Sequence, residues 1–509
     1  MWKALKPVSL VAVGTVAGVM LSLNFSAQAD RVSAAQLPLP VEDLRMFSEV
    51  FGKIKSDYVE NIDDKKLIKE AINGMVSGLD PHSSFLDQEA FKELQVGTQG
   101  EFGGLGIEVG MEDGFVKVIS PIDDSPASRA GIKAGDFIIK LDDTAVRGMT
   151  LNDAVKRMRG KPKTPITLTV VRKGTEQPLT FTLVRDTVKV KSVKMKTLEP
   201  GYAVIKVTQF QEQTGESLAQ AIHQAYKDSP QGLKGLVLDL RNDPGGLLNS
   251  AVAVSAAFLP KDALVVYTDG RTEDAKMRLF ATRENYLRGG AFRDDYLAKL
   301  PEAIKSVPIV VLVNQGTASA SEIVAGALQD HKRAIVMGTQ SFGKGSVQSI
   351  VPLNNNTAIK LTTARYFTPN GRSIQAKGIT PDIIVEDPTL TSAEQGLSLR
   401  ESDLQRHLLG DEEKTGAKAT PKPELPADIT PESKPGSATP ASPSSKLESI
   451  GDGKAAAGEL PAKPGDKPRV NRREIDDKND FQLNQALNQL KGVPVVASVN
   501  TPIVNPAKP

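Results

Sequence analysis

The spacing of apolar residues predicts three kinds of segment in the first 390 positions. Over 41–98, apolar residues recur every three or four positions, which indicates helices. From 100 to 186, apolar runs of strand length are separated by glycine turns, with one helix expected near 151–159. From 187 to 390, strand-length runs such as 309–313 alternate with helical segments. The pattern therefore predicts an N-terminal helical region, a small β-rich module and an α/β core.

The composition changes after this core. Between 410 and 470, Pro, Lys, Ala, Ser and Glu dominate and apolar residues are few. Such a segment buries too little apolar surface to offset its ordering entropy, so we expect a disordered linker. Helical spacing returns in 474–492, with Leu483, Leu487 and Leu490 on one face. We expect a C-terminal helix that docks on the core or on another subunit.

The first 29 residues have the layout of a secretory signal peptide. Two lysines precede an apolar run at 8–23, and Ala-Gln-Ala at 27–29 forms an A-x-A cleavage site. The alternative is an uncleaved membrane anchor, although the run is shorter than the roughly 20 residues of a good span. Later apolar runs have only strand length. We therefore expect a periplasmic or otherwise extracytoplasmic protein, soluble or tethered at its N-terminus.

Charge and composition exclude several classes of function. The 63 Lys and Arg and 61 Asp and Glu give a net charge of only +2, which argues against a nucleic-acid partner, since that needs a basic face. The absence of cysteine excludes disulfides, zinc–thiolate sites and cysteine nucleophiles. Four histidines restrict His-based triads and metal sites: His82, His223, His331 and His407. We interpret His82 as a turn residue, because nothing in the sequence pairs it with a second ligand.

Ser319 is the first catalytic candidate. It lies in 314–322, Asn-Gln-Gly-Thr-Ala-Ser-Ala-Ser-Glu, between a buried strand and an amphipathic helix. Free backbone N–H groups and the positive helix end converge at such a turn and stabilise an oxyanion. The alternative is structural, because Ser319 and Glu322 have capping-box spacing, in which the serine only satisfies helix donors. This stretch alone favours the cap.

A serine nucleophile needs a base, and Lys344 is a better candidate than His331. Lys344 lies between Gly343 and Gly345, where desolvation would have to lower its pKa from about 10.4 towards neutrality. Gln348 follows four residues later and, if both residues lie in one strand, shares its face and can orient the amine. The alternative is an exposed lysine in a glycine turn. A phosphate-binding P-loop is disfavoured, because Gly345 stands where that motif needs Ser or Thr.

A glycine pair supplies the third element of the candidate site. Residues 235–246 form a buried strand that runs into a turn ending in Gly245 and Gly246. Without side chains, their N–H groups can approach a substrate carbonyl and complete an oxyanion hole with the N–H of Ala320. The alternative is that the pair only makes a turn.

Together these motifs resemble the carboxyl-terminal processing peptidases, the tail-specific proteases of peptidase family S41. The similarity spans about 41–387, and four stretches carry it: 239–246, 314–322, 343–348 and 364–374. The resemblance implies a Ser–Lys dyad, with Ser319 as nucleophile and Lys344 as general base assisted by Gln348. It implies an α/β, ClpP/crotonase-like protease core with an inserted β-rich PDZ domain. One departure is Asp243, where the family resemblance leads us to expect asparagine.

The β-rich module resembles a PDZ domain. Residues 102–107, Phe-Gly-Gly-Leu-Gly-Ile, begin a strand after a glycine loop, which presents successive N–H groups to a carboxylate. The resemblance implies that Leu105, Gly106 and Ile107 receive a substrate's C-terminal carboxylate and its last apolar side chain. The alternative is a purely structural β-module.

The leading hypothesis is an exported serine endopeptidase that captures protein C-termini and needs no metal, nucleotide or other cofactor. The partners we expect are protein substrates with exposed C-termini, further copies of the chain in a homo-oligomer, and an activating protein. Two alternatives are a catalytically inactive PDZ scaffold and a crotonase-like acyl enzyme. The joint presence of Ser319, Lys344 and Gln348 argues against the scaffold. The hypothesis of a crotonase-like acyl enzyme does not explain the presence of the Ser–Lys pair or of the PDZ module.

Overall fold

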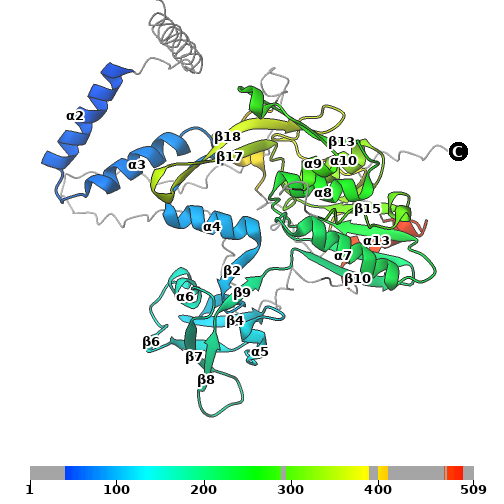
Figure 1. Cartoon of the computed structure of the whole chain (residues 1–509), viewed down its shortest axis with the longest axis horizontal. Coiled ribbons are helices and arrows are strands. Elements are labelled where there is room, and N and C mark those ends of the chain that lie inside the picture. Colours follow the sequence, from blue (N-terminus) through cyan, green and yellow to red (C-terminus); the bar gives the residue numbers. More distant parts are fainter. Residues whose placement is uncertain (1–39, 288–293, 389–398, 411–474, 476–478, 497–509) are drawn as a thin grey trace, which may run out of the picture. The chain divides into compact units, whose positions relative to one another are not determined.

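The computed structural model describes residues 40–287, 294–388, 399–410, 475 and 479–496, and Figure 1 shows the order of its elements. The predicted signal peptide and all but the first residue of the predicted linker lie outside the described residues. In the part of the chain that is described, no helix has the length and apolar character of a membrane span.

The chain separates into two units, residues 1–74 and 75–509. The first unit holds α2 (Val41–Asp57) and most of α3 (Asp64–Ser77), so the helical character predicted here is confirmed. The second unit begins with the end of α3, the short β1 (Ser84–Leu86) and α4 (Gln88–Gln99).

The β-rich module of the second unit is bounded by two neighbouring strands. β2 (Glu101–Gly104) pairs antiparallel with β9 (Asp186–Lys189), so the chain leaves the module where it enters. The sheet between them has the order β3-β4-β5-β7-β8, with β6 paired to β5. Its elements are β3 (Ile107–Glu112), β4 (Phe115–Pro121), α5 (Pro126–Arg129), β5 (Phe137–Leu141), β6 (Thr144–Ala145), α6 (Leu151–Met158), β7 (Pro165–Val171) and β8 (Leu179–Val184). The single strand expected to begin within 102–107 is therefore two strands, β2 and β3.

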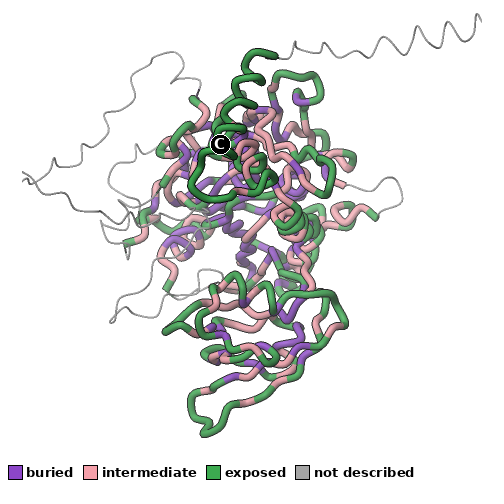
Figure 2. The backbone as a smooth tube through the Cα atoms, turned by 90° about the vertical axis from the view of Figure 1, so that its left-hand side faces the viewer, coloured by how far each residue is buried: buried purple, intermediate pink, exposed green. Residues whose placement is uncertain are grey.

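This module has a hydrophobic core of its own. On β7, Ile166, Leu168 and Val170 are buried while their neighbours are more exposed, which is the period-two pattern of a sheet with one covered face. Ala154 and Met158 of α6 join the same cluster. Figure 2 shows buried segments both in the larger core and in this smaller module.

The α/β core is built on a six-stranded sheet of order β10-β11-β12-β15-β16-β19. All neighbouring pairs are parallel except β10 with β11. The strands are β10 (Val193–Glu199), β11 (Tyr202–Val207), β12 (Gly235–Asp239), β15 (Ile309–Val313), β16 (Ile335–Gly338) and β19 (Ile383–Ile384). The predicted alternation of strands and helices is confirmed.

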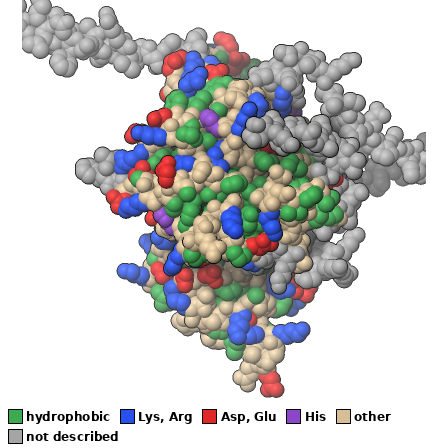
Figure 3. Space-filling view, turned by 90° about the vertical axis from the view of Figure 1, so that its right-hand side faces the viewer, with side chains coloured by type: hydrophobic (Ala, Val, Ile, Leu, Met, Phe, Trp, Pro, Cys, Tyr) green, Lys and Arg blue, Asp and Glu red, His purple; other side chains and the backbone are tan. Residues whose placement is uncertain are grey.

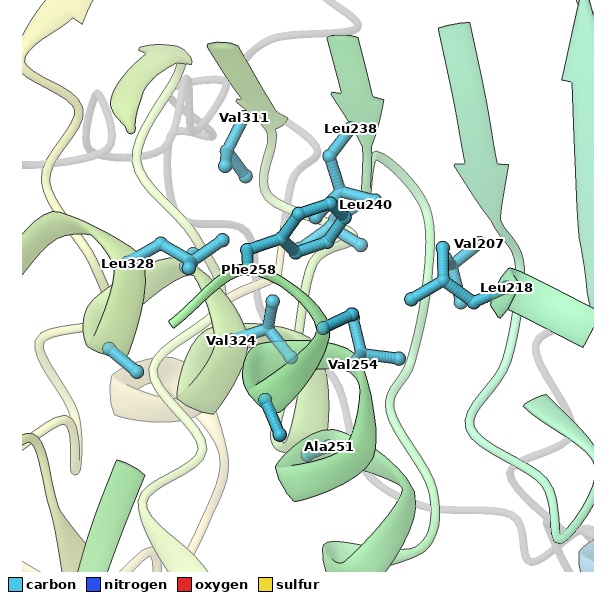
Figure 4. Close-up of a cluster of buried hydrophobic side chains, with 14 of the residues drawn as sticks. Val207, Leu218, Leu238, Leu240, Ala251, Val254, Phe258, Val311, Val324 and Leu328 are labelled. Atoms are coloured by element: carbon cyan, nitrogen blue, oxygen red, sulfur yellow. The ribbon is translucent and has the colours of Figure 1, made fainter. Parts of the chain in front are cut away.

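Helices cover both faces of this sheet, which is why β12 and β15 are buried along their whole length. One face carries α7 (Thr214–Lys227), α8 (Leu248–Phe258) and α10 (Ala320–Asp330); Leu238, Val254 and Val324 meet in the cluster drawn in Figure 4. The opposite face packs on α13 (Phe481–Leu490), whose Leu483 joins Val237 and Val310. The predicted C-terminal helix thus docks on the core, and it is shorter than 474–492.

A second sheet, which the sequence pattern did not indicate, lies beside the core sheet. It has the order β1-β18-β13-β14, with β17 also paired to β18. Its strands are β13 (Leu264–Gly270), β14 (Arg278–Phe280), β17 (Ser346–Pro352) and β18 (Ala358–Phe367), besides β1. The remaining short elements are α9 (Arg283–Tyr286), η2 (Glu273–Ala275), η3 (Glu302–Lys305), η4 (Asn354–Asn356) and η5 (Glu401–Asp403). Because β1 pairs with β18 in register Ser84 to Lys360, residues near 80 are brought to the carboxyl half of the chain.

Charged side chains of both signs are mixed over the face shown in Figure 3. Lys and Arg do not gather there into one continuous basic surface of the kind that nucleic-acid binding requires.

Candidate active site

Ser319 lies at the turn between β15 and α10 in an unusual backbone conformation. Its φ is +56° and its ψ is −114°, whereas an ordinary cap such as Thr150 has φ −72° and ψ 157°. A non-glycine residue in such a sparsely populated region costs about 1–3 kcal/mol and persists only where its surroundings enforce it. Strain of this kind concentrates at functional sites, so the geometry favours a chemical role for Ser319 over a mere cap.

The buried carboxylate of Glu322 ties the serine turn to the lysine turn. Its Oε2 accepts the N–H of Ser319 at 2.8 Å and that of Lys344 at 2.9 Å. Its Oε1 accepts the Ser341 hydroxyl at 2.5 Å and the Gly343 N–H at 2.7 Å. Burial raises the pKa of Glu322 to about 7, and the hydrogen bonds from these donors oppose that rise. The sequence indicated only the capping-box part of this role.

Glu322→Gln is expected to slow cleavage at least about tenfold in a protein that still folds. Glutamine keeps the length of the side chain but replaces one acceptor oxygen with an NH₂ group, which would face donors. Steady-state cleavage rates and thermal unfolding curves measure both effects. Glu216→Gln, at an exposed glutamate in the first turn of α7, is the matched control and should change neither. Full activity in Glu322→Gln would show that the carboxylate does not organise the site.

Lys344 lies in a buried loop. Burial is the largest cause that lowers its pKa to about 8, and the neighbouring Lys360 adds to the effect. The carboxyl groups of Glu401, Glu322 and Asp80 oppose it. The shift has the direction that a general base requires, because more of the amine is neutral near physiological pH.

Gln348 makes its hydrogen bonds within the second sheet. Its Nε2 donates to Ser346 Oγ at 2.9 Å and to Thr362 Oγ1 at 3.3 Å. The prediction that Lys344 and Gln348 share a strand face is wrong, because β17 begins only at Ser346. Among the hydrogen bonds of the described residues, none joins Lys344 Nζ to Gln348 or to Ser319 Oγ. Such contacts are often long in proteins without bound substrate.

Tyr366 explains part of the 364–374 motif. It is buried on β18, and its hydroxyl donates to the backbone carbonyl of Lys344. Burial raises the Tyr366 pKa well above its ordinary value, and the nearby side chain of Ser319 opposes that rise in part. The next part of the chain adds a second support, since Gln375 Oε1 accepts the N–H of Gly345 at 3.0 Å.

His82 has a partner that the sequence interpretation missed. Its Nε2 lies 2.8 Å from Oε2 of the buried Glu401, 319 residues away in the chain. Gln375 Nε2 also donates to Glu401, at 2.9 Å. In the described residues, no group of three or more His, Asp or Glu side chains could hold a metal ion.

The glycine turn lies directly against Ser319. Gly245 has φ +95°, and a Cβ there would lie 2.8 Å from both the Ala320 nitrogen and the Ser319 Cβ, so only glycine fits. The N–H of Gly245 donates to Asp243 Oδ1 at 2.8 Å. Among the described residues, no hydrogen bond engages the N–H of Gly246 or Ala320. Of the three predicted oxyanion donors, the Gly245 N–H is therefore already engaged within its own loop.

Polar residues of the 314–322 motif join the serine turn to the glycine turn. Asn314 Oδ1 accepts the N–H of Asn242 at 2.9 Å, and Asn314 Nδ2 donates to Asn242 Oδ1 at 3.1 Å. The Thr317 hydroxyl donates to the carbonyl of Leu240 at 2.9 Å. The two loops therefore form one hydrogen-bonded unit around Ser319.

In the β-rich module, the three predicted peptide-binding residues lie at the start of the edge strand β3. Gly106 has φ +73°, and a Cβ there would lie 2.2 Å from the Ser125 Cβ. The Gly106 carbonyl accepts the Ser125 hydroxyl at 3.1 Å, which fixes the loop. Leu105 is buried, and Ile107 is half-buried against the module core. Among the described strands, β3 pairs only with β4, so it is an edge strand of its sheet.

Comparisons with known proteins agree with this architecture. The family model of peptidase family S41 matches residues 201–385, that of the PDZ domain matches 103–183, and that of the activating protease CtpB N-terminal domain matches 14–90. The carboxy-terminal-processing protease of Bartonella bacilliformis is 48% identical over 401 residues, which cover 78% of this chain and 88% of that protein.

Two further relatives are more distant. The carboxy-terminal processing protease CtpB of Bacillus subtilis is 34% identical over 76% of this chain and 79% of its own. A solved photosystem II D1 C-terminal processing protease is 30% identical, with a TM-score of 0.37 over 71% of this chain and 92% of its own. From its sequence matches and its PDZ-bearing α/β fold, the chain belongs to the carboxy-terminal processing proteases of peptidase family S41, which are serine-type peptidases.

Proposed function

We propose that this protein is an exported endopeptidase that captures the C-termini of protein substrates on its PDZ domain and cleaves them with a dyad of Ser319 and Lys344. The observation that carries the proposal is the shared carboxylate of Glu322, which bonds the backbone of both residues. The lowered pKa of Lys344 supports the same assignment. Gln348 would support the base once Lys344 turns towards Ser319.

The chemistry follows from the protonation states. The neutral Lys344 amine takes the proton of the Ser319 hydroxyl as the oxygen attacks the substrate carbonyl carbon. The N–H groups of Gly246 and Ala320 hold the oxygen that becomes negative, while Gly245 lets the turn approach. The Lys344 ammonium then gives its proton to the leaving amine. A water molecule, deprotonated by Lys344, hydrolyses the acyl-enzyme and restores both groups.

The PDZ domain would supply the selection of substrates. The N–H groups of Leu105, Gly106 and Ile107 would bind the terminal carboxylate, and the edge strand β3 would pair with the peptide backbone. The N-terminal helical region would serve assembly into a homo-oligomer or contact with an activating protein. Export by residues 1–29 is part of the proposal.

The function is tested with one peptide made as free acid and as C-terminal amide. Amidation removes the charge that the N–H groups of the PDZ loop bind, so cleavage below saturation should fall about tenfold or more. Peptide release followed by chromatography measures the two rates. As a control, one residue of the peptide far from its C-terminus is substituted in both the acid and the amide. The ratio of the two cleavage rates should then stay the same, because this change does not touch the C-terminal carboxylate.

Two outcomes would contradict this proposal in different ways. Equal cleavage of acid and amide would show that the domain does not read the C-terminal carboxylate. Binding of the free acid with cleavage of neither peptide would favour the inactive PDZ scaffold.

A further inference from the structure

We propose that Asp243 is a positioning residue that holds the loop 242–246, here called the oxyanion loop, and that it does so only in its protonated, neutral form. The proposal rests on the proposed function, because it assigns that loop to the oxyanion of the reaction at Ser319. Asp243 touches neither substrate nor the reacting atoms; it acts through the backbone of Gly245 and its neighbours.

Asp243 joins the oxyanion loop to the serine turn on both sides of Ser319. Its Oδ1 accepts the N–H of Gly245 at 2.8 Å. Its backbone carbonyl accepts the N–H of Ala318 at 3.0 Å and the hydroxyl of Ser321, also at 3.0 Å. The side chain and the backbone of this one residue therefore set the distance between the two sources of oxyanion donors.

The second carboxyl oxygen of Asp243 is isolated. The residue has no exposed surface, and its Oδ2 has no hydrogen-bond partner. Leaving an ionised carboxylate oxygen bare in a dry interior is far more costly than leaving a neutral acid there. The geometry alone thus favours a proton on Oδ2.

The charges around Asp243 act in the same direction. Burial raises its pKa to about 8, and the negative charge of Asp239 on β12 adds a smaller rise, while the N–H of Gly245 and the nearby hydroxyl of Ser321 oppose the rise in part. The nearby cations are already engaged, since Arg241 and Lys206 pair with Asp239 at 2.9 and 3.6 Å. Among the described residues, no Lys, Arg or His forms an ion pair with Asp243.

The groups on α10 place no positive charge beside Asp243. Glu322, in the first turn of this helix, bonds the loop of Ser341 and Gly343 instead. Ser321 carries no charge; its hydroxyl donates to the backbone carbonyl of Asp243 and opposes the rise in the Asp243 pKa only in part. Ionisation of Asp243 would therefore place an uncompensated negative charge beneath the loop where the transition state itself becomes negative, which opposes the reaction.

A neutral Asp243 has the shape and the acceptor of an asparagine. This explains why the departure from asparagine at position 243 is compatible with the resemblance noted from the sequence. It also predicts a difference that asparagine would not show, namely loss of activity at alkaline pH.

The test compares the pH profiles of kcat/KM for wild type and Asp243→Asn with one free-acid peptide. Every other titrating group is common to both proteins, so the ratio of the two rates isolates Asp243. We expect Asp243→Asn to match wild type within about twofold at pH 6.5. At pH 9.5, about 1.5 units above a pKa of about 8, roughly 3% of Asp243 is protonated, so the variant should be roughly thirtyfold faster.

Two further variants complete the series. Asp243→Ala removes the acceptor of the Gly245 N–H and should be more than tenfold slower than Asp243→Asn at every pH. Asp262→Asn, at an exposed aspartate, is the matched control and should leave the profile unchanged.

A second readout does not depend on activity. Because the pKa of Asp243 is raised in the folded state, wild type should lose stability relative to Asp243→Asn as pH rises from about 4 to about 8, with no further change above. The ratio of the two unfolding equilibrium constants, from denaturant titrations, should change by up to tenfold per pH unit in that window.

A flat rate ratio up to pH 9.5, or a flat ratio of unfolding constants, overturns the role given to Asp243. So does an Asp243→Asn rate below one tenth of wild type at pH 6.5, since the ionised carboxylate would then be needed. In each of these cases the proposed function still stands, provided that Ser319→Ala abolishes cleavage. Cleavage that survives Ser319→Ala would instead end the proposed function, and the unfolding titration would still report on Asp243.

Discussion

Replacing Ser319 by alanine is expected to reduce peptide cleavage at least about 10⁴-fold while the protein stays folded. The substitution removes the only atom that could attack the substrate in the proposed mechanism, and losses of that order accompany removal of a serine nucleophile. Cleavage of a free-acid peptide and thermal unfolding of the same preparation measure the two effects. Ser306→Ala, at an exposed serine, is the control and should retain the full rate.

The backbone conformation at position 319 allows a test that distinguishes a nucleophilic serine from a serine that only caps the helix. A mere cap would lose about 1 kcal/mol of stability on replacement by alanine and keep its turnover. Because φ is +56°, Ser319→Gly should be as inactive as Ser319→Ala but more stable by about 1 kcal/mol, since glycine adopts this conformation without strain. Substantial cleavage by either folded variant would exclude Ser319 as the nucleophile.

Lys344→Arg is expected to be as inactive as Lys344→Ala, with at least about a 10³-fold loss of rate. Arginine keeps the positive charge and nearly the same reach, but it cannot lose a proton at any usable pH. The pair of variants therefore separates a base from a residue that only supplies charge. Kinetic assays and unfolding curves are the measurement, and Lys227→Arg, at an exposed lysine of α7, is the matched control.

The wild-type rate should also rise with pH towards the lowered pKa of Lys344, about 8, because only the neutral amine can take the Ser319 proton. Gln348→Ala should be less severe than either lysine variant, since it disturbs the orientation of the base without removing it. Substantial activity in Lys344→Arg would mean that the base lies elsewhere, with His331 as the first residue to test.

The sequence by itself determined the classes of segment and the residues of the candidate site. The helical spacing of 41–98 and the alternation of β7 are local properties, so they could be recognised without a structure. The uninterrupted apolar runs of β12 and β15 already indicated strands covered on both faces. Ser319 and Lys344 were identified because their surrounding motifs are contiguous in the chain.

Only the tertiary structure decided how these residues are held. Glu322 bonds the loop at 341–344, and His82 meets Glu401 across 319 residues, neither of which any local pattern predicts. The burial that lowers the pKa of Lys344 comes from packing around it, not from its flanking glycines. The partners of Gln348 likewise depend on where β17 begins.

The oxyanion loop shows the same division. The glycines at 245 and 246 were evident from the sequence, whereas the engagement of the Gly245 N–H by Asp243 was not. Hydrophobic periodicity and turn chemistry depend on residues that are neighbours in the chain, so they can be recognised from the sequence alone. The partner of a buried donor and the protonation of a buried acid depend on atoms that only the folded chain brings together, and these were decided by the tertiary structure.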